Sequence, residues 1–265
     1  MKKTLFLLCA AAALMLSSCS SVPLTGRSRV LLVSEADVLS SSLSQYSEYM
    51  KTATPSTNAA GKAMVERVGK KIAAAAEKFM TDNGMADDLV NYSWEFNLVK
   101  DDELNAFCMP GGKIVVYDGL LQLVSSDADL AVVVGHEVAH AVAKHSAERL
   151  SQQMLAQYGA VALSTVLSTK SEAAQQLGQT VYGLGANYGV MLPFSRKHES
   201  EADYMGIIFM ALAGYDPSVA VTFWQKMAAT GQNNIPAILS SHPSDEKRIK
   251  DLEKNLPTAQ QYYQH

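Results

Sequence analysis

The stretch AVVVGHEVAHAVAKH, at residues 131–145, constrains the fold more than any other part of this sequence. It places His136, Glu137 and His140 inside a run of small apolar residues. Ionisable groups on an apolar helix are disfavoured unless something pairs with them, and a metal ion is the obvious candidate. On a helix, His136 and His140 lie four residues apart and point to the same side, spaced to bind one ion.

Two neutral imidazoles suit zinc, and the glutamate beside them can accept a proton from water in the open position of the metal. This is the HExxH arrangement. The pattern therefore predicts one zinc ion per chain, with His136 and His140 as ligands and Glu137 as the general base.

A catalytic zinc site needs a third protein ligand. His145 follows the second histidine by five residues and turns away on the helix, so a carboxylate must supply the ligand. In SRKHESEAD, residues 195–203, Glu199 and Asp203 share one helix face. We predict Glu199 as the ligand, with Glu201 as the alternative, and Asp203 as the acceptor that orients an imidazole.

The motifs HEVAH, SRKHESEAD and SHPSDEKRI together resemble the zinc endopeptidases that include the CAAX prenyl protease, HtpX, mitochondrial OMA, LoiP and BepA. In outline the chain is most similar to LoiP, an outer-membrane lipoprotein. The resemblance implies an α+β, mainly helical, gluzincin-like metallopeptidase domain with a small β-sheet beside the HExxH helix. It also implies zinc held by His136, His140 and Glu199, with Glu137 as the base.

The same resemblance places His242 beside the metal. A neutral imidazole there could fill the open zinc position and keep the enzyme latent, or donate a hydrogen bond to the oxyanion. The simpler interpretation is a loop histidine before a helix that Ser244 caps. We expect a net loss of turnover, with zinc still bound, when His242 is removed.

The segment NAFCMPGGKIVVY, residues 105–117, predicts a strand, a tight turn and a second strand, and an alternating strand precedes it at Trp94, Phe96 and Leu98. A peptide substrate could pair with the edge formed by Asn105, Ala106 and Phe107. The alternative is that this hairpin is only sheet structure.

Helical spacing marks residues 36–82. The HExxH helix is predicted to start at Ser126 and to end near Arg149. Further helices are predicted over 151–190 as a mobile cover loosened by glycines, over 195–212 with Gly214 as its stop, and over 244–255.

The N-terminus, MKKTLFLLCAAAALMLSSCSS, predicts an export signal over residues 1–18. Its end resembles the lipobox of bacterial lipoproteins, so lipidation of Cys19 is expected to attach the chain to a membrane. Residues 19–35 are then expected to form a linker and residues 36–265 the zinc metallopeptidase domain.

The net charge of the whole chain is −4, and removal of the signal with its two lysines leaves −6. Nucleic acid is therefore not an expected partner. Of the three cysteines, Cys9 lies in the signal, Cys19 would carry lipid, and Cys108 is expected to be a small buried hydrophobe.

Together these patterns predict a zinc endopeptidase of the bacterial cell envelope, lipid-anchored at the outer membrane and facing the periplasm. It would hydrolyse unfolded or misassembled envelope proteins as quality control. The alternative from another class is a chaperone-like, non-proteolytic zinc-binding lipoprotein, against which Glu137 argues because a structural zinc site has no use for a base.

Overall fold

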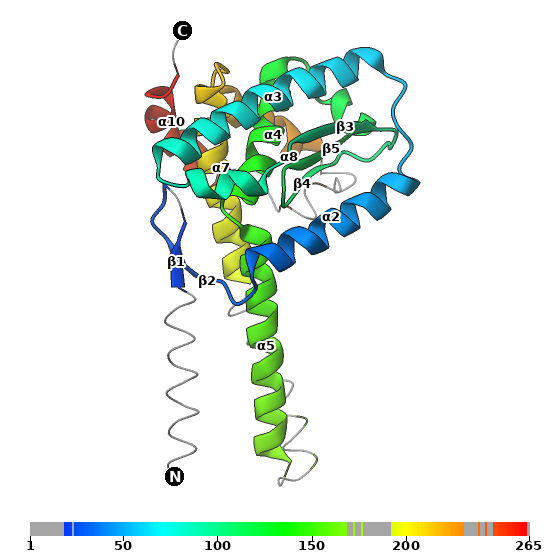
Figure 1. Cartoon of the computed structure of the whole chain (residues 1–265). Helices are drawn as coiled ribbons and strands as arrows, with labels where there is room; N and C mark the ends of the chain where they lie inside the picture. The colour runs from blue at the N-terminus through cyan, green and yellow to red at the C-terminus, as the bar shows by residue number, and fades with distance from the viewer. Residues whose placement is uncertain are drawn as a thin grey trace. The chain divides into compact units, whose positions relative to one another are not determined.

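The computed structural model describes residues 19–22, 24–168, 172, 176, 192–230, 238, 242 and 246–263. The predicted signal, Ser244, His265 and most of 169–191 lie outside them. The elements of the described part are β1 (Cys19–Ser21), β2 (Ser28–Val30), α2 (Glu35–Thr52), α3 (Ala59–Asp82), η1 (Ala86–Asn91), β3 (Glu95–Val99), β4 (Ala106–Met109), β5 (Lys113–Tyr117), η2 (Asp118–Gln122), α4 (Asp127–Val142), α5 (His145–Leu167), α7 (Leu192–Leu212), α8 (Val219–Thr230) and α10 (Glu246–Gln260) (Figure 1). The predicted mainly helical α+β class is confirmed.

The chain divides into two compact units. Unit 1 draws on residues 1–37 and 145–197, and unit 2 on residues 38–144 and 198–265. Within the described residues, no helix combines the length and the apolar character that crossing a membrane requires.

Unit 2 contains a three-stranded sheet with the order β3-β5-β4. β4 runs antiparallel to β5 as the sequence predicts, and β3 runs parallel to β5. The turn between β4 and β5 contains Gly111 and Gly112 with φ of 93° and 81°, a backbone region that residues with a side chain rarely adopt. Because β5 lies between the other two strands, β4 is an edge strand of this sheet.

Helices cover both faces of this sheet. Val115 packs with Val99 and with Tyr46 of α2 on one face. Because side chains alternate along a strand, the buried Ile114 and Val116 point to the other face. There α3 packs against β3 and against α4, and α4 packs against β4. The sheet thus fixes the position of α4.

Helix α4 begins where the sequence predicts but ends earlier. The Ser126 hydroxyl accepts a hydrogen bond from the backbone N–H of Asp129 at 3.2 Å, which caps the first turn. The expected end near Arg149 is wrong, because the helix stops at Val142. Ala143 and Lys144 separate α4 from α5, and Lys144 adopts the left-handed region, with φ of 55°.

The C-terminal helices agree in part with the sequence. α7 ends at Leu212, and Gly214 follows it with φ of 79°, as predicted. The last helix runs to Gln260 and not to Asn255, because Pro257 is tolerated within its final turns. Helix α8 has no counterpart among the predicted elements.

In unit 1, the segment predicted as a linker contains regular structure. β1 and β2 form an antiparallel pair in which Cys19 stands opposite Val30. The two terminal guanidinium nitrogens of Arg27, Nη1 and Nη2, each donate to a carboxylate oxygen of Glu148 at 2.7 Å, and β2 contacts α5. Interactions with the first turns of α5 therefore hold this segment. The domain boundary at residue 35 stays a prediction.

Candidate active site

Helix α4 carries the HExxH residues into the interior of unit 2. His136 and Glu137 are 1% and 3% exposed, and every residue from Leu130 to Ala139 is buried. The apolar residues on either side of the motif pack against α3, β4 and α8, which keeps His136 and Glu137 away from water, whereas the His140 side chain is 14% exposed. This burial leaves the ionisable groups dependent on partners within the protein.

Helix α7 approaches α4 at two glycines. A Cβ atom at Gly206 would lie 3.0 Å from the backbone nitrogen of His136, and one at Gly135 would lie 3.0 Å from the carbonyl oxygen of Gly206. The two backbones therefore touch at a point where no side chain fits. One and two turns before this crossing, α7 presents Asp203 and Glu199 to the histidines of α4.

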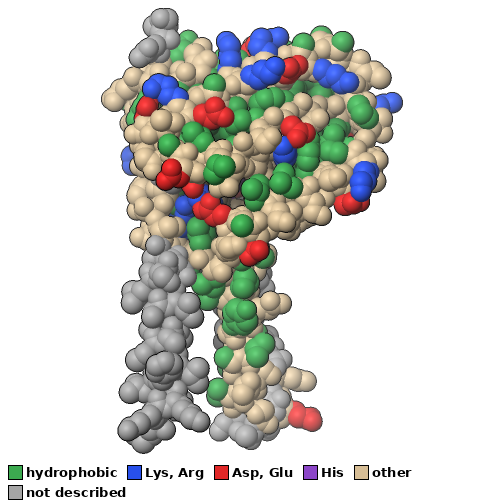
Figure 2. All heavy atoms as spheres, in the orientation of Figure 1, with side chains coloured by type: hydrophobic (Ala, Val, Ile, Leu, Met, Phe, Trp, Pro, Cys, Tyr) green, Lys and Arg blue, Asp and Glu red, His purple; other side chains and the backbone are tan. Residues whose placement is uncertain are grey.

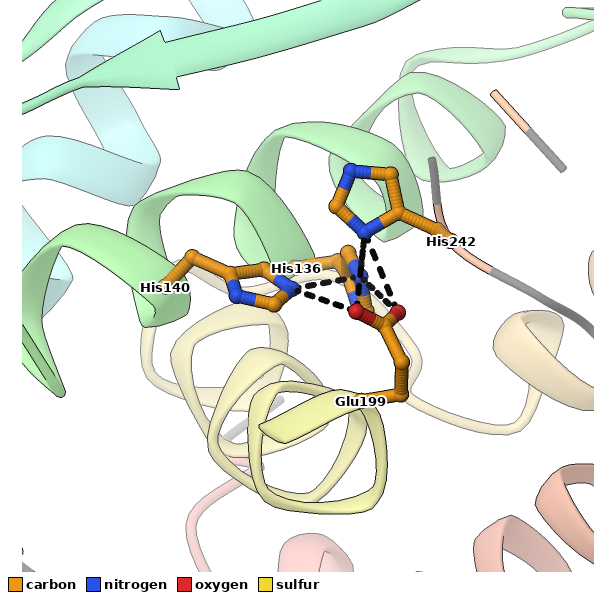
Figure 3. Close-up of side chains that lie close together, drawn as sticks. All are labelled: His136, His140, Glu199 and His242. Atoms are coloured by element: carbon orange, nitrogen blue, oxygen red, sulfur yellow. Dashed lines mark hydrogen bonds and ion pairs between the residues drawn. The ribbon is translucent and has the colours of Figure 1, made fainter. Parts of the chain in front are cut away.

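Four side chains converge at this point (Figure 3). Nε2 of His136 lies 3.0 Å from Nε2 of His140 and 3.2 Å from Oε2 of Glu199. Nε2 of His140 lies 3.4 Å from Oε1 of Glu199. One ligand atom from each of these residues and from His242 falls within a span of 4.8 Å.

The electrostatics of this cluster favour a cation. Burial alone would raise the pKa of Glu199, but its contacts with His136, His140 and His242 lower that pKa far below the usual range. Burial would likewise lower the pKa of His136, but Asp203 and Glu199 raise it to about 9. The carboxylate of Glu199 is thus held ionised against the histidines.

Asp203 and Arg248 support the first histidine from behind. Oδ1 of Asp203 lies 2.9 Å from Nδ1 of His136, and Arg248 donates to both carboxylate oxygens of Asp203, from Nε at 2.7 Å and from Nη2 at 2.6 Å. Burial would raise the pKa of Asp203, but the charge of Arg248 lowers it to about 2. The carboxylate of Asp203 faces Nδ1 and favours a proton there, which leaves Nε2 as the nitrogen that can bind a metal ion once it gives up its own proton.

Arg248 also fixes neighbouring groups. Its guanidinium lies 4.4 Å from the ring centroid of the buried Trp224, and that ring packs edge-on against His136 at 5.5 Å. Nη1 of Arg248 donates to the carbonyl oxygen of His242 at 3.2 Å. One side chain therefore connects Asp203, Trp224 and the backbone of His242.

His242 lies between the cluster and Glu137. Its Nδ1 is 3.1 Å from both carboxylate oxygens of Glu199 and 3.3 Å from Nε2 of His136. Its Nε2 is 3.4 Å from Oε1 of Glu137. That Oε1 atom is buried and makes no hydrogen bond to any described residue.

Comparison with known proteins identifies the family. Residues 61–256 match Peptidase family M48. The chain belongs to Peptidase family M48. It is 40% identical over 198 residues to mitochondrial metalloendopeptidase OMA1 of Schizosaccharomyces pombe, covering 74% of this chain and 53% of the relative.

Two further relatives of this M48 chain are a human protein and a bacterial protein. Human mitochondrial metalloendopeptidase OMA1 is 29% identical over 245 residues, covering 89% of this chain and 46% of the relative. The beta-barrel assembly-enhancing protease of Escherichia coli is 32% identical over 168 residues, covering 61% and 34%. The chain thus spans about half the length, or less, of these curated relatives. The greater likeness to LoiP stays a prediction.

The donor set fits the zinc that M48 peptidases use. Nε2 of His136 lies 3.2 Å from a carboxylate oxygen of Glu199, so a cation that displaced the Nε2 proton would be bound by both atoms. Two imidazoles and a carboxylate are also a known ligand set of catalytic zinc. The residues that would hold the ion are His136, His140 and Glu199, with His242 as a fourth candidate.

The other predicted positions have different surroundings. Glu201 is buried but is absent from the cluster of possible metal ligands. Ala106 and Phe107 lie on the edge strand β4, and Asn105 precedes it. Cys19 begins β1 in unit 1. The roles predicted for these residues, as for those of the cluster, remain proposals.

Cys108 is a free cysteine that is only partly buried, so the predicted full burial is not met. Burial, together with the charge of Glu137, raises the pKa of its thiol well above the usual range. His145 and His198 are both 2% exposed. Both are therefore interior groups.

Sequence reasoning missed Arg248, Trp224 and the pair of glycines. Arg248 stands inside the SHPSDEKRI motif, but the motif alone assigns it no partner. Gly135 and Gly206 did carry a signal, since a glycine inside a helix is costly and often marks a close approach of backbones. Nothing in the sequence pattern pointed to Trp224.

Proposed function

We propose that this M48 chain is a zinc-dependent endopeptidase of the bacterial cell envelope that hydrolyses unfolded or misassembled proteins. The observation that carries the proposal is the buried carboxylate of Glu137 beside the cluster of ligands. A metal held only for structure has no use for an adjacent base. A carboxylate whose Oε1 makes no hydrogen bond within the described chain is instead available to take a proton.

The chemistry that zinc supplies when held by His136, His140 and Glu199 is polarisation of the scissile carbonyl and acidification of water. Glu137 then accepts the proton of the attacking water and transfers it to the leaving amine. Asp203 keeps the Nδ1 proton of His136 in place, so that Nε2 remains a ligand.

For His242, the contacts support both of its proposed uses. Nδ1 lies among the ligand atoms, which supports a role as a fourth ligand that keeps the enzyme latent. Nε2 lies on the side of Glu137, where a donor could stabilise the oxyanion once Nδ1 leaves the cluster. Movement of the backbone at His242 would have to break its hydrogen bond from Arg248.

For the location, the proposal rests on the sequence. The lipobox supports lipidation of Cys19, and with it attachment to the outer membrane facing the periplasm. The relatives include both mitochondrial metalloendopeptidases and a bacterial protease. A peptide substrate is proposed to pair with β4, because it is an edge strand of the described sheet.

The test is cleavage of unfolded casein by the purified full chain, with and without a chelator, beside the variant Glu137→Gln. We expect cleavage that the chelator stops and zinc restores. The variant should keep zinc near one ion per chain and lose cleavage, because the glutamate serves as a base. Retention of casein without cleavage by the wild-type chain would support the chaperone-like alternative instead.

A further inference from the structure

Helix α5 in unit 1 exposes an unusual number of apolar side chains. Among the described residues, the large hydrophobic side chains that are exposed lie mostly on this helix. They are Leu150, Leu155, Tyr158, Val161 and Val166, with exposed fractions from 38% to 69%. We call these five residues the α5 stripe. Figure 2 shows hydrophobic side chains spaced along the helix.

The stripe occupies one side of the helix. At about 100° per residue, its five members fall within an arc of roughly 160°. Gln153, Gln157 and Ser164 fall together outside that arc. The helix therefore has an apolar face and an uncharged polar face.

No charged residue interrupts this surface. From Leu150 to Thr169 the sequence contains no Asp, Glu, Lys, Arg or His. Thr165 lies within the apolar arc, but its hydroxyl donates to the carbonyl oxygen of Val161 at 2.9 Å, so the helix itself satisfies this donor. A helix surface that faces water or a polar partner usually carries charged side chains, whereas this surface is suited to contact with hydrocarbon.

The start of α5 is tied to the segment that begins at Cys19. Arg27 makes two hydrogen bonds to Glu148, and the backbone N–H of Leu32 donates to the Ser151 hydroxyl at 2.8 Å. These contacts hold the β1–β2 hairpin on the first turns of α5. If Cys19 is lipidated, unit 1 is the part of the chain that the acyl chains bring to a bilayer.

We propose that the α5 stripe inserts into the interfacial region of a lipid bilayer. The helix lies in the membrane surface and does not cross it, which agrees with the finding that no described helix could span a bilayer. Tyr158 suits this depth, because its ring is apolar and its hydroxyl can reach the headgroups. The inference rests on the proposed membrane attachment and is separate from the peptidase chemistry.

The test is quenching of tryptophan fluorescence by brominated acyl chains. The full chain is purified from membranes and reconstituted into phosphatidylethanolamine and phosphatidylglycerol vesicles, in the variants Tyr158→Trp and Val90→Trp. Val90 is a matched control, because it is an apolar residue that is 85% exposed and lies in η1, outside the α5 stripe. Both variants retain Trp94 and Trp224, so only the added residue differs.

We expect the brominated lipid to remove most of the added fluorescence in Tyr158→Trp and little of it in Val90→Trp. Charged replacements, Val161→Glu with Val166→Glu, should abolish the quenching in Tyr158→Trp while the chain still floats with the vesicles. Val90→Glu should leave it unchanged.

Quenching at position 158 no greater than at position 90 would overturn the proposal. That result would also be obtained if a second copy, or residues 169–191, covered the stripe. A chain that does not float at all would overturn it too. Casein cleavage by the same samples reports separately on the peptidase proposal, so the two can fail independently.

Discussion

A single methyl group at the crossing of α4 and α7 should weaken metal binding without replacing any of the proposed ligands. In Gly206→Ala, the new Cβ would lie 3.0 Å from the nitrogen of His136 and 3.2 Å from its Cα. Both atoms belong to the backbone of a buried helix, so no flexible side chain can move aside. The helices must separate.

The required separation can be worked out from these distances. Ordinary contact begins at 3.4 Å, so the 3.0 Å approach demands about 0.4 Å of movement. Ligand distances in a metal site are held to about 0.2 Å. We therefore expect zinc affinity to fall on the order of 10-fold to 100-fold, as when supporting groups of a metal site are lost. Overpacking should cost about 1–3 kcal/mol of stability, offset by about 1 kcal/mol from the better helix propensity of alanine.

The assay is competition for zinc against a chromogenic chelator, together with thermal unfolding. Gly84→Ala is the control, because Gly84 has φ of 74° with nothing within 4 Å of the added Cβ. It should lose about 1 kcal/mol of stability through backbone strain and keep its zinc affinity. If Gly206→Ala binds zinc as tightly as the wild-type chain, the argument that backbone contact places Glu199 is refuted.

The remaining predictions concern single side chains. Glu199→Ala should lose zinc while Glu201→Ala keeps it, measured as metal content after gel filtration, and the reverse result would show that the ligand was assigned wrongly. Arg248→Lys keeps the charge but lacks the fork that binds Asp203, so zinc affinity should fall about 10-fold in the chelator competition; unchanged affinity would remove Arg248 from the support of the site. His242→Ala should retain zinc and lose turnover on the order of 100-fold with saturating peptide, whereas a rise in turnover would show that His242 only blocks the site. Cys19→Ala should move the protein from the membrane to the soluble fraction, and a variant retained at the membrane would show a different anchor.

The parts of the fold that sequence predicted are those set by local patterns. Ser126 and Asp129, three residues apart, indicate the start of α4, and the two glycines after Pro110 indicate the turn between β4 and β5. The HExxH spacing needs only the helical repeat to bring His136 and His140 together. Glu199 required more, since no local rule states which part of a distant helix meets the motif.

The parts that sequence did not predict depend on tertiary contacts. Lys144 ends the run of α4 without a glycine or a proline, and an ion pair from its Nζ to Asp88 at 2.8 Å supports the turn. Local propensity favours continuing the helix there, so the break became visible only in the structure. The exposure of Tyr158 could not be predicted from the sequence either, because an apolar helical pattern is the same whether protein or lipid covers the helix.

Arg248 shows how the fold joins stability to the site. Its guanidinium and the carboxylate of Asp203 are both about 95% buried, so removing either charge would leave the other without its partner in the interior. Asp203 of this pair lies against Nδ1 of His136. Arg248 of the same pair donates a hydrogen bond to the carbonyl oxygen of His242. The orientation of His136 and the placement of His242 therefore cannot vary independently. A change at Arg248 must alter both, and this is why the C-terminal helix α10, which contributes no ligand, belongs to the active site.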